Sequence, residues 1–484
     1  MNINTERNAL WSIIDNLAQQ FLSLLVFLIL ARLISPRDFG VIAVLHVLVT
    51  FFRQSVLDAI VLPISRTNEA TDELYSWGLG ICMLAATLMA AIMIGVTPWA
   101  SDWFDISELR DILPWMALVV LAYGASAAFE ARLIRKLAFR SLAIRSVIAV
   151  TTGGIVGIAY ALEVGGVMSL VAQQVASSCV ALILLIAQSH WTPNLLKGKK
   201  NWRRFSPDIY RVSATGFMGF LSSQGDTVLV SVLLGAQATG FYSFAKRLTS
   251  SVYLAFGAAV LRLSISAFAT AHTDAEALKK AYLRILGTSF FLMLPMLLGL
   301  SVLIEPTIHV LFGDAWLPAA SIVVLLSALY LLLVVNQVND YLLYAINVRS
   351  APLKRSLSQI LLSIIFGWAG SQFGLAWMAA GFALATFSVW PWNQRTCNTY
   401  LSLRLSELVY CMLAPLIGAF CMVALLWLFL PSIQIHVADP GTSQIAKLGA
   451  WITFGAAIYV ALHRVVIKLL PGVHDAFREV RGRE

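Results

Sequence analysis

The feature that most constrains this 484-residue chain is a succession of fourteen long apolar spans joined by short polar loops. Each span has about the ~20 residues that an α-helix needs to cross a ~30 Å hydrocarbon core. Lipid offers no hydrogen bonds to peptide groups, so a chain crossing it must bond internally, as a helix does. The spans comprise residues 10–34, 41–64, 74–98, 112–130, 142–162, 167–188, 212–234, 242–268, 282–304, 317–345, 356–372, 375–393, 408–430 and 446–468. The sequence therefore predicts an all-α polytopic membrane protein with about fourteen transmembrane helices.

Composition agrees with this class, and the sequence lacks several motifs of catalytic and metal sites. Hydrophobic residues make up 59% of the chain and charged residues 12%, about half the ~25% typical of soluble domains. The five cysteines lie in or beside apolar spans at no metal or redox spacing, so we interpret them as packing residues. The sequence contains no phosphate-binding GxxxxGK[ST] loop and no His/Asp/Glu cluster with metal spacing. It predicts no catalytic residue, no metal site and no cofactor.

Basic residues recur on every second loop, and this asymmetry predicts the orientation. If the N terminus is cytoplasmic, the basic groups at 132–145, 197–211 and 464–483 all lie inside. The opposite loops hold only three basic residues: Arg37, Arg110 and Lys447. Because Lys and Arg resist translocation, we expect both termini to lie in the cytoplasm. The net charge of +9 then faces the headgroups of membrane lipids, which argues against a nucleic-acid partner.

Loop lengths predict the domain organisation. The longest cytoplasmic loop, 189–211, follows the sixth span and predicts the boundary between two lobes of six helices each, at 1–188 and 212–393. The remaining residues, 394–484, then form two appended helices and a basic cytoplasmic tail.

The two predicted lobes also share a weak internal repeat. A shift of 200 positions places Leu33 on Leu233 and Gly40 on Gly240, and it aligns the short turns Ser35–Gly40 and Gly235–Gly240. Repeats of this kind are typical of transporters, in which the substrate path lies between the repeats. The repeat therefore favours a transporter with two pseudo-symmetric lobes.

Polar residues inside the apolar spans carry the functional signal. An ionisable group at mid-bilayer costs about 2.5–3.5 kcal/mol, so it normally faces a partner or a wet cavity. Here polar residues recur at helical spacing on one face of the first two spans of each predicted lobe and of the tenth span. The candidate substrate-binding residues are Asn16, Arg53, Lys246, Arg247, Arg262 and Asn336. The candidate charge partners, or carriers of H⁺ or Na⁺ coupling, are Asp15, Asp58, Asp226 and Asp340.

These residue types suit one class of ligand. Arg and Lys side chains bind oxygen-rich anions such as a diphosphate, Arg as a fork and Lys as a point charge. The alternative is that buried pairs such as Arg53–Asp58 or Lys246–Asp226 only lock helix packing. Tryptophans near span ends, among them Trp191, Trp316 and Trp392, are interpreted as an aromatic belt at the membrane interface.

Four stretches resemble one family. Residues 30–41, with the sequence LARLISPRDFGV, resemble the first hairpin of Wzx-type polysaccharide flippases. Residues 129–145, 225–248 and 311–316 fit the same family in order and spacing. Together the four stretches extend over about the first 350 residues, and they are most similar to the exopolysaccharide branch.

The resemblance implies a MATE-like fold, in which two six-helix lobes form a V around a central cavity and two extra helices help to guide a lipid tail. It also implies a function. A polyprenyl-diphosphate-linked oligosaccharide would cross the cytoplasmic (inner) membrane by alternating access, with a polysaccharide polymerase and chain-length machinery as further partners. The related lipid II flippases use cationic cavity residues, and Arg53, Lys246 and Arg247 fall in comparable helices.

Two alternatives stay open at this point. A MATE-type exporter of organic cations, driven by H⁺ or Na⁺, would share the architecture, but cationic cavity residues argue against it. An integral-membrane glycan polymerase would normally need a substantial external loop with catalytic residues. The longest candidate, 431–444, holds only His436 and Asp439.

Overall fold

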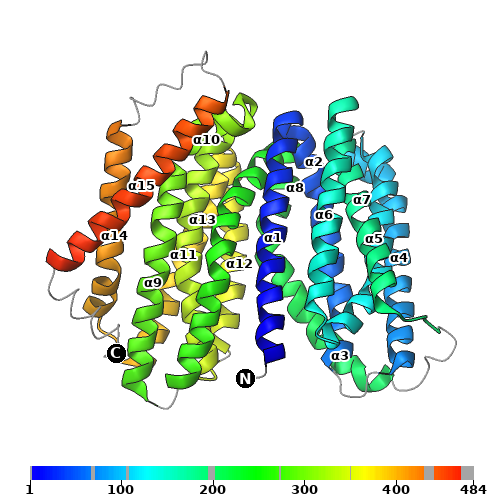
Figure 1. Cartoon of the computed structure of the whole chain (residues 1–484), viewed down its shortest axis with the longest axis horizontal. Helices are drawn as coiled ribbons and strands as arrows, with labels where there is room; N and C mark the ends of the chain where they lie inside the picture. Colours follow the sequence, from blue (N-terminus) through cyan, green and yellow to red (C-terminus); the bar gives the residue numbers. More distant parts are fainter. Residues whose placement is uncertain are drawn as a thin grey trace. The chain divides into compact units, whose positions relative to one another are not determined.

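A computed structural model describes residues 3–66, 71–104, 108–194, 202–271, 274–348, 350–429 and 441–469. Within these ranges the chain is helical throughout, with short connections between the helices (Figure 1). Its contacts divide it into unit 1, Met1–Ser243, and unit 2, Phe244–Glu484. This division falls inside one long helix, whereas the predicted lobe boundary at 189–211 stays a prediction.

The helices of unit 1 are α1 (Ile3–Leu33), α2 (Pro36–Phe52), the π-helix η1 (Arg53–Leu57), α3 (Asp58–Arg66), α4 (Asp72–Phe104), α5 (Leu109–Arg135), α6 (Phe139–Glu163), α7 (Met168–Ser189) and the first part of α8 (Trp202–Ala271). Unit 2 holds the rest of α8, then α9 (Ala275–Val302), α10 (Ile304–Thr307), the π-helix η2 (Ile308–Phe312), the 3₁₀-helix η3 (Asp314–Ala319), α11 (Ala320–Ala345), α12 (Ser350–Ser371), α13 (Leu375–Leu401), α14 (Leu405–Phe429) and α15 (Gly441–Leu469).

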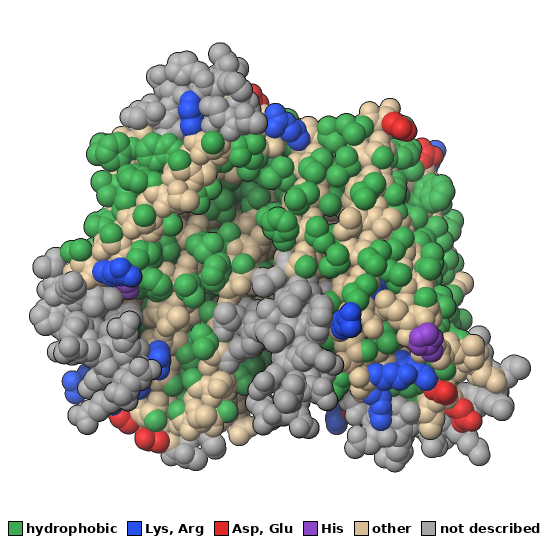
Figure 2. Space-filling model, in the orientation of Figure 1, with side chains coloured by type: hydrophobic (Ala, Val, Ile, Leu, Met, Phe, Trp, Pro, Cys, Tyr) green, Lys and Arg blue, Asp and Glu red, His purple; other side chains and the backbone are tan. Residues whose placement is uncertain are grey.

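Eleven helical stretches among the described residues are long and apolar enough to cross a membrane. Hydrophobic side chains cover most of the surface drawn for the described residues, and the visible Asp and Glu side chains lie near its upper and lower edges (Figure 2). Such a surface is expected where lipid, and not water, surrounds the helices. The all-α polytopic membrane class predicted from the sequence is confirmed.

The difference between eleven stretches and fourteen predicted spans has a local explanation. The predicted spans 212–234 and 242–268 both lie in α8. This element consists of two helices that join at a kink, where Gly235 has a non-helical backbone (φ 78°). The first predicted span lies in α1, whose side chains are described from Ala18 onward, so its described apolar part is Ala18–Leu33. α12 is a 22-residue helix that is not among the eleven. Each predicted span therefore falls on a helix, although three of them do not stand out as separate apolar stretches.

In unit 1 the helices pair mainly with chain neighbours. α4 packs on α5, and α6 packs on α7. In addition, α1 packs on α6, and α5 packs on α7. The turn from α1 to α2 has clear sequence causes. The Ser35 hydroxyl oxygen accepts the backbone N–H of Asp38 at 3.2 Å, and Pro36 occupies the first helical position, where its missing N–H has no cost.

Unit 2 contains the appended pair of helices. α14 packs on α9, and α15 packs on both α14 and α9. Glycines allow these approaches: a methyl group at Gly418 would lie 3.3 Å from the Tyr459 ring, and one at Gly455 would lie 3.2 Å from the Leu426 side chain. Small residues at helix contacts are typical of membrane proteins, where close van der Waals packing replaces the hydrophobic effect.

Two of the tryptophans predicted to form an interfacial belt are instead buried. Trp191 lies beside Tyr75 and Phe129, with ring centroids 6.1 and 5.1 Å away, and the guanidinium carbon of Arg132 lies 5.5 Å from its ring. Trp316 stacks on Phe244 with ring centroids 4.4 Å apart. The belt interpretation is therefore wrong for both. Both residues lie near the ends of predicted spans, but their rings are buried against aromatic side chains of neighbouring elements.

Candidate functional site

Arg53, the first sequence candidate, lies at a break in helix geometry. It opens the π-helix η1, in which the Asp58 backbone N–H bonds to the Arg53 carbonyl five residues back. The wider turn of a π-helix rotates the side chains that follow it relative to a regular α-helix. π-Bulges of this kind occur frequently at functional sites. The Arg53 side chain is exposed although it lies inside a 30-residue apolar stretch.

The partners of Arg53 come from neighbouring helices of unit 1. Its guanidinium carbon lies 5.9 Å from the centre of the Tyr123 ring on α5, within the range of a cation–π contact. Gln174 on α7 donates to the Tyr123 hydroxyl at 3.1 Å. Asp58, half-buried at the start of α3, is close enough to Arg53 and Glu130 for their charges to act on it. We call these five residues the Arg53 cluster.

A second ion pair adjoins this cluster. Glu130 on α5 and Arg145 on α6 lie 3.6 Å apart, and both side chains are largely shielded. The predicted loop around these residues is in fact short: α5 extends to Arg135 and α6 begins at Phe139. Arg145 therefore lies in a helix that packs within the bundle, as the predicted span 142–162 implies, although its charge was counted with the basic group 132–145.

Asp226, a predicted charge partner, lies on α8 in unit 1. Its carboxylate accepts the hydroxyl of the fully buried Tyr242 at 2.6 Å and the Thr227 backbone N–H at 2.7 Å. Lys246 and Arg247 lie on the same helix, in unit 2, where Lys246 is half-buried and Arg247 is exposed. The proposed pairing of Lys246 with Asp226 stays a prediction.

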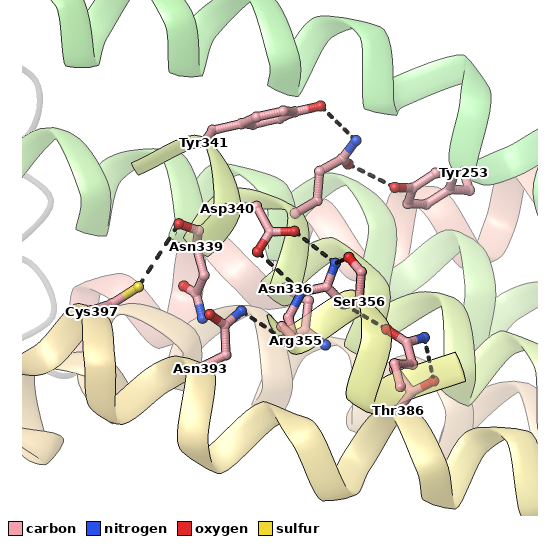
Figure 3. A network of polar contacts seen from close by, with 12 residues as sticks. Tyr253, Asn336, Asn339, Asp340, Tyr341, Arg355, Ser356, Thr386, Asn393 and Cys397 are labelled. Atoms are coloured by element: carbon pink, nitrogen blue, oxygen red, sulfur yellow. Dashed lines mark hydrogen bonds and ion pairs between the residues drawn. The ribbon is translucent and has the colours of Figure 1, made fainter. Parts of the chain in front are cut away.

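Unit 2 contains the best-defined charged site among the described residues. Its cationic residue, Arg355, was not among the candidates predicted from the sequence. Arg355 on α12 binds Asp340 on α11 with both prongs of its fork, Nε to Oδ1 at 3.1 Å and Nη2 to Oδ2 at 2.8 Å (Figure 3). Only 11% of the Arg355 side chain and 14% of the Asp340 side chain are exposed. Gln359, one turn further along α12, accepts from Arg355 Nη1 at 2.6 Å and donates to Thr386 on α13 at 3.1 Å.

Amide and phenol groups surround this ion pair. Asn393 on α13 donates to Asn336 on α11 at 3.1 Å, and both side chains are buried. On the other side, Gln337 accepts from Tyr253 at 2.8 Å and donates to Tyr341 at 2.7 Å (Figure 3). Each of these groups offers donors and acceptors without a formal charge, which is the chemistry that sugar hydroxyls match.

The ten candidate residues predicted from the sequence thus lie in different environments. Arg53 and Asp58 come together in unit 1, Asp226 binds a tyrosine, and Asn336 is a buried member of the network around Asp340. The side chains of three candidates lie outside the described residues: Asp15, Asn16 and Arg262. The sequence signal for Arg355 was its i, i+4 spacing to Gln359 on one helical face, together with Asn393 at the end of the predicted span 375–393.

Comparisons with known proteins identify the family. The family model described as "Polysaccharide biosynthesis protein" matches residues 29–321. The succinoglycan biosynthesis transport protein ExoT of Rhizobium meliloti is 27% identical over 326 residues, which cover 66% of this chain and 65% of that protein. The chain therefore spans somewhat less than two thirds of the length of this relative.

Solved structures show the same fold. The lipid II flippase MurJ, in an inward closed conformation, matches with a TM-score of 0.74 at 16% sequence identity, covering 95% of this chain and 99% of MurJ. An inward-facing multidrug resistance MATE family transporter of the MOP superfamily matches with a TM-score of 0.60 at 15% identity, covering 80% of this chain and 98% of the transporter. The predicted MATE-like fold is confirmed at the level of the helix arrangement that these structures share.

Proposed function

This chain belongs to the polysaccharide biosynthesis protein family of Wzx- and ExoT-like flippases, a transporter family and not an enzyme family, and from that premise we propose its cargo and mechanism. We propose that it moves a polyprenyl-diphosphate-linked oligosaccharide from the cytoplasmic to the outer leaflet of the inner membrane by alternating access. The lipid tail stays in the membrane while the charged headgroup crosses through the protein. The product would supply the synthesis of an exopolysaccharide or another surface polysaccharide.

The observation that carries this proposal is the exposed guanidinium of Arg53 inside a membrane-spanning stretch. An Arg side chain at this depth is costly unless it meets water or an anion. The diphosphate is the charged part of the cargo, and it matches the fork of an arginine. Lys246 and the exposed Arg247 on α8 are the further cations that we assign to it. Around the Asp340–Arg355 pair, the half-buried phenol of Tyr253 and the half-buried amides of Gln337 and Gln359 suit the sugars.

Topology follows from the same proposal. We propose fourteen crossings, with α8 crossing twice about its break at Gly235 and with α1 and α12 as crossings outside the eleven stretches. The first twelve crossings would form two pseudo-symmetric six-helix lobes, and α14 and α15 would be the appended pair. Both termini would then lie in the cytoplasm, in agreement with the basic residues on alternate loops.

The direct test is to find which leaflet holds the lipid-linked oligosaccharide in a strain that lacks this gene. Completed units that accumulate on the cytoplasmic face, with loss of the polymer, would support flipping, and their mass would identify the glycan. Units that reach the outer face but remain unpolymerised would contradict the proposal. An unchanged glycan with altered drug sensitivity would also contradict it and would favour an exporter.

The cationic residues give a sharper prediction. Arg53→Ala, and separately Lys246→Ala combined with Arg247→Ala, should each lower glycan export at least about tenfold, because a hydrogen bond to a charged group is worth about 1.5–3 kcal/mol and 1.4 kcal/mol is about a factor of ten. Export is measured as polymer released per cell, normalised to protein in the membrane. Arg110→Ala is the matched control, since Arg110 is an exposed arginine at the start of α5, 3.6 Å from Asp102 and outside the proposed site. Normal export in both cationic variants would remove Arg53, Lys246 and Arg247 from the site.

A further inference from the structure

Two glycines that are 200 positions apart in the sequence touch each other in unit 1. A methyl group at Gly40 would lie 2.6 Å from the Ala236 carbonyl carbon and 2.9 Å from the Gly240 nitrogen, and it would overlap the Ala236 oxygen. Conversely, a methyl group at Gly240 would lie 2.8 Å from the Pro36 carbonyl carbon and 3.2 Å from the Gly40 nitrogen, and it would overlap the Pro36 oxygen. Real Cβ atoms do not approach backbone this closely, so neither position accepts any other residue without movement.

The two halves of this contact are equivalent by symmetry. Pro36 and Ala236 are related by the same 200-position shift as Gly40 and Gly240. Each glycine packs on the carbonyl group of the residue four positions before its counterpart. A local two-fold axis therefore passes between the two turns. In transporters built from repeats, the boundary between repeats is the place where alternating access opens and closes.

The contact lies at one end of the helices. α1 runs from near the N terminus to Leu33, and α2 begins at Pro36 at the opposite end of unit 1 (Figure 1). A second contact between α8 and the α2–η1 segment lies 15 residues further along, where Ser213 donates to the Ser55 carbonyl at 2.7 Å. At 1.5 Å per helical residue, this second contact is about 22 Å from the first. It adjoins Arg53, which we assign to the substrate.

The closest contacts at Gly40 and Gly240 are with backbone. The three atoms nearest to a methyl group at either glycine all belong to the backbone of the facing turn. Gly124 in the α4–α5 pair differs, because a methyl group there would lie nearest to the Ala86 side chain.

We propose that the contact of Pro36–Gly40 with Ala236–Gly240 is a seal that closes the transport path at the end away from the N terminus, and that it closes only because residues 40 and 240 are glycine. This inference rests on the proposed function, because alternating access requires one end of the transport path to close before the other end opens. Any side chain at either position keeps the two turns apart and leaves this end open.

The test uses a cysteine placed at the seal. Thr239 is fully buried beside Gly240, so Thr239→Cys in the purified full-length chain reports opening through its rate of reaction with a water-soluble maleimide. Labelling of the chain without this substitution is subtracted, since five native cysteines are present. The reporter is combined in turn with Gly40→Ala and Gly240→Ala. Two control variants are Gly95→Ala, where a methyl group would meet nothing within 4 Å, and Gly124→Ala, which disturbs packing away from the seal.

Both seal variants should raise the labelling rate at least about tenfold, the effect of forcing an extra methyl group into a tight contact. Both should also lower glycan export in the chain without the reporter, while Gly95→Ala and Gly124→Ala leave labelling unchanged. Unchanged labelling in the two seal variants, or an equal rise in Gly124→Ala, would overturn the proposal. Because labelling does not depend on the cargo, a wrong cargo assignment would alter the export result alone.

A second measurement covers the case in which the seal variants do not fold. In the unmodified chain, hydrogen exchange of the amides at 37–41 and 236–241 should occur together and faster than exchange at the α4–α5 contact around Gly124. Equal protection of the two regions would show a static packing contact and would overturn the seal.

Discussion

Replacing Arg355 with methionine is expected to destabilise the protein by about 3–5 kcal/mol, the cost of leaving a buried charge without its partner. Asp340 would keep a carboxylate in a site that is 14% exposed and would lose both prongs of the guanidinium fork. Gln359 would lose its bond from Arg355 as well. The measurement is the fraction of purified protein that remains monodisperse after heating in detergent. Survival equal to that of the parent chain would contradict the buried-pair geometry.

A double variant separates a structural role from a functional one. Asp340→Asn with Arg355→Met removes both charges, so no unpaired charge remains and most of the lost stability should return. If the pair only locks α11 to α12, export should return together with stability. We expect export to stay low, because Arg355 orients Gln359, one of the amide groups that we assign to the sugars. Full recovery of export would assign the pair to helix packing alone.

The sequence predicted the class and the helix positions well because both follow from local physics. A run of about twenty apolar residues has only one way to cross lipid, so each predicted span falls on a helix. The Ser35–Pro36 turn could also be predicted, since a helix N-cap and a proline at the first helical position depend only on residues within four positions of each other. The repeat alignment, too weak to prove anything by identity, pointed to two glycines that the fold brings into contact.

The site was harder to predict because its partners come from different helices. Arg355 directly precedes the predicted span 356–372, and a positive charge at such a span end normally faces the cytoplasm, so it was not among the candidate site residues. In the structure α12 begins at Ser350, and Arg355 lies more than a turn inside it, where it meets Asp340. Asp340 was found as an ionisable residue in an apolar span, yet its partner depends on how α11 packs on α12. That information is absent from the periodicity of either helix.

The tryptophans give the second large prediction and show the same limit. Trp316→Ala should destabilise the protein by about 3–5 kcal/mol, the range for removing a large buried aromatic side chain. Trp316 is 1% exposed and packs on Phe244, which in turn meets Phe312 edge-on at 4.8 Å. Trp392, which belongs to the same predicted belt, is 43% exposed. Trp392→Ala is therefore the matched control, and its effect should be small.

Removing the Trp316 ring should lower glycan export as well as stability, because of the position of Phe244. It is four residues after Gly240 and two before Lys246 on α8, so the Trp316 stack fixes the segment that links the proposed seal to the proposed cations. Thermal unfolding in detergent should show a much larger drop in Tm for Trp316→Ala than for Trp392→Ala, and Trp316→Phe should recover part of it. Export at a permissive temperature should fall in Trp316→Ala alone. Equal drops in Tm for the two alanine variants would mean that Trp316 faces lipid, as the sequence first indicated, and that the seal needs no anchor in η3.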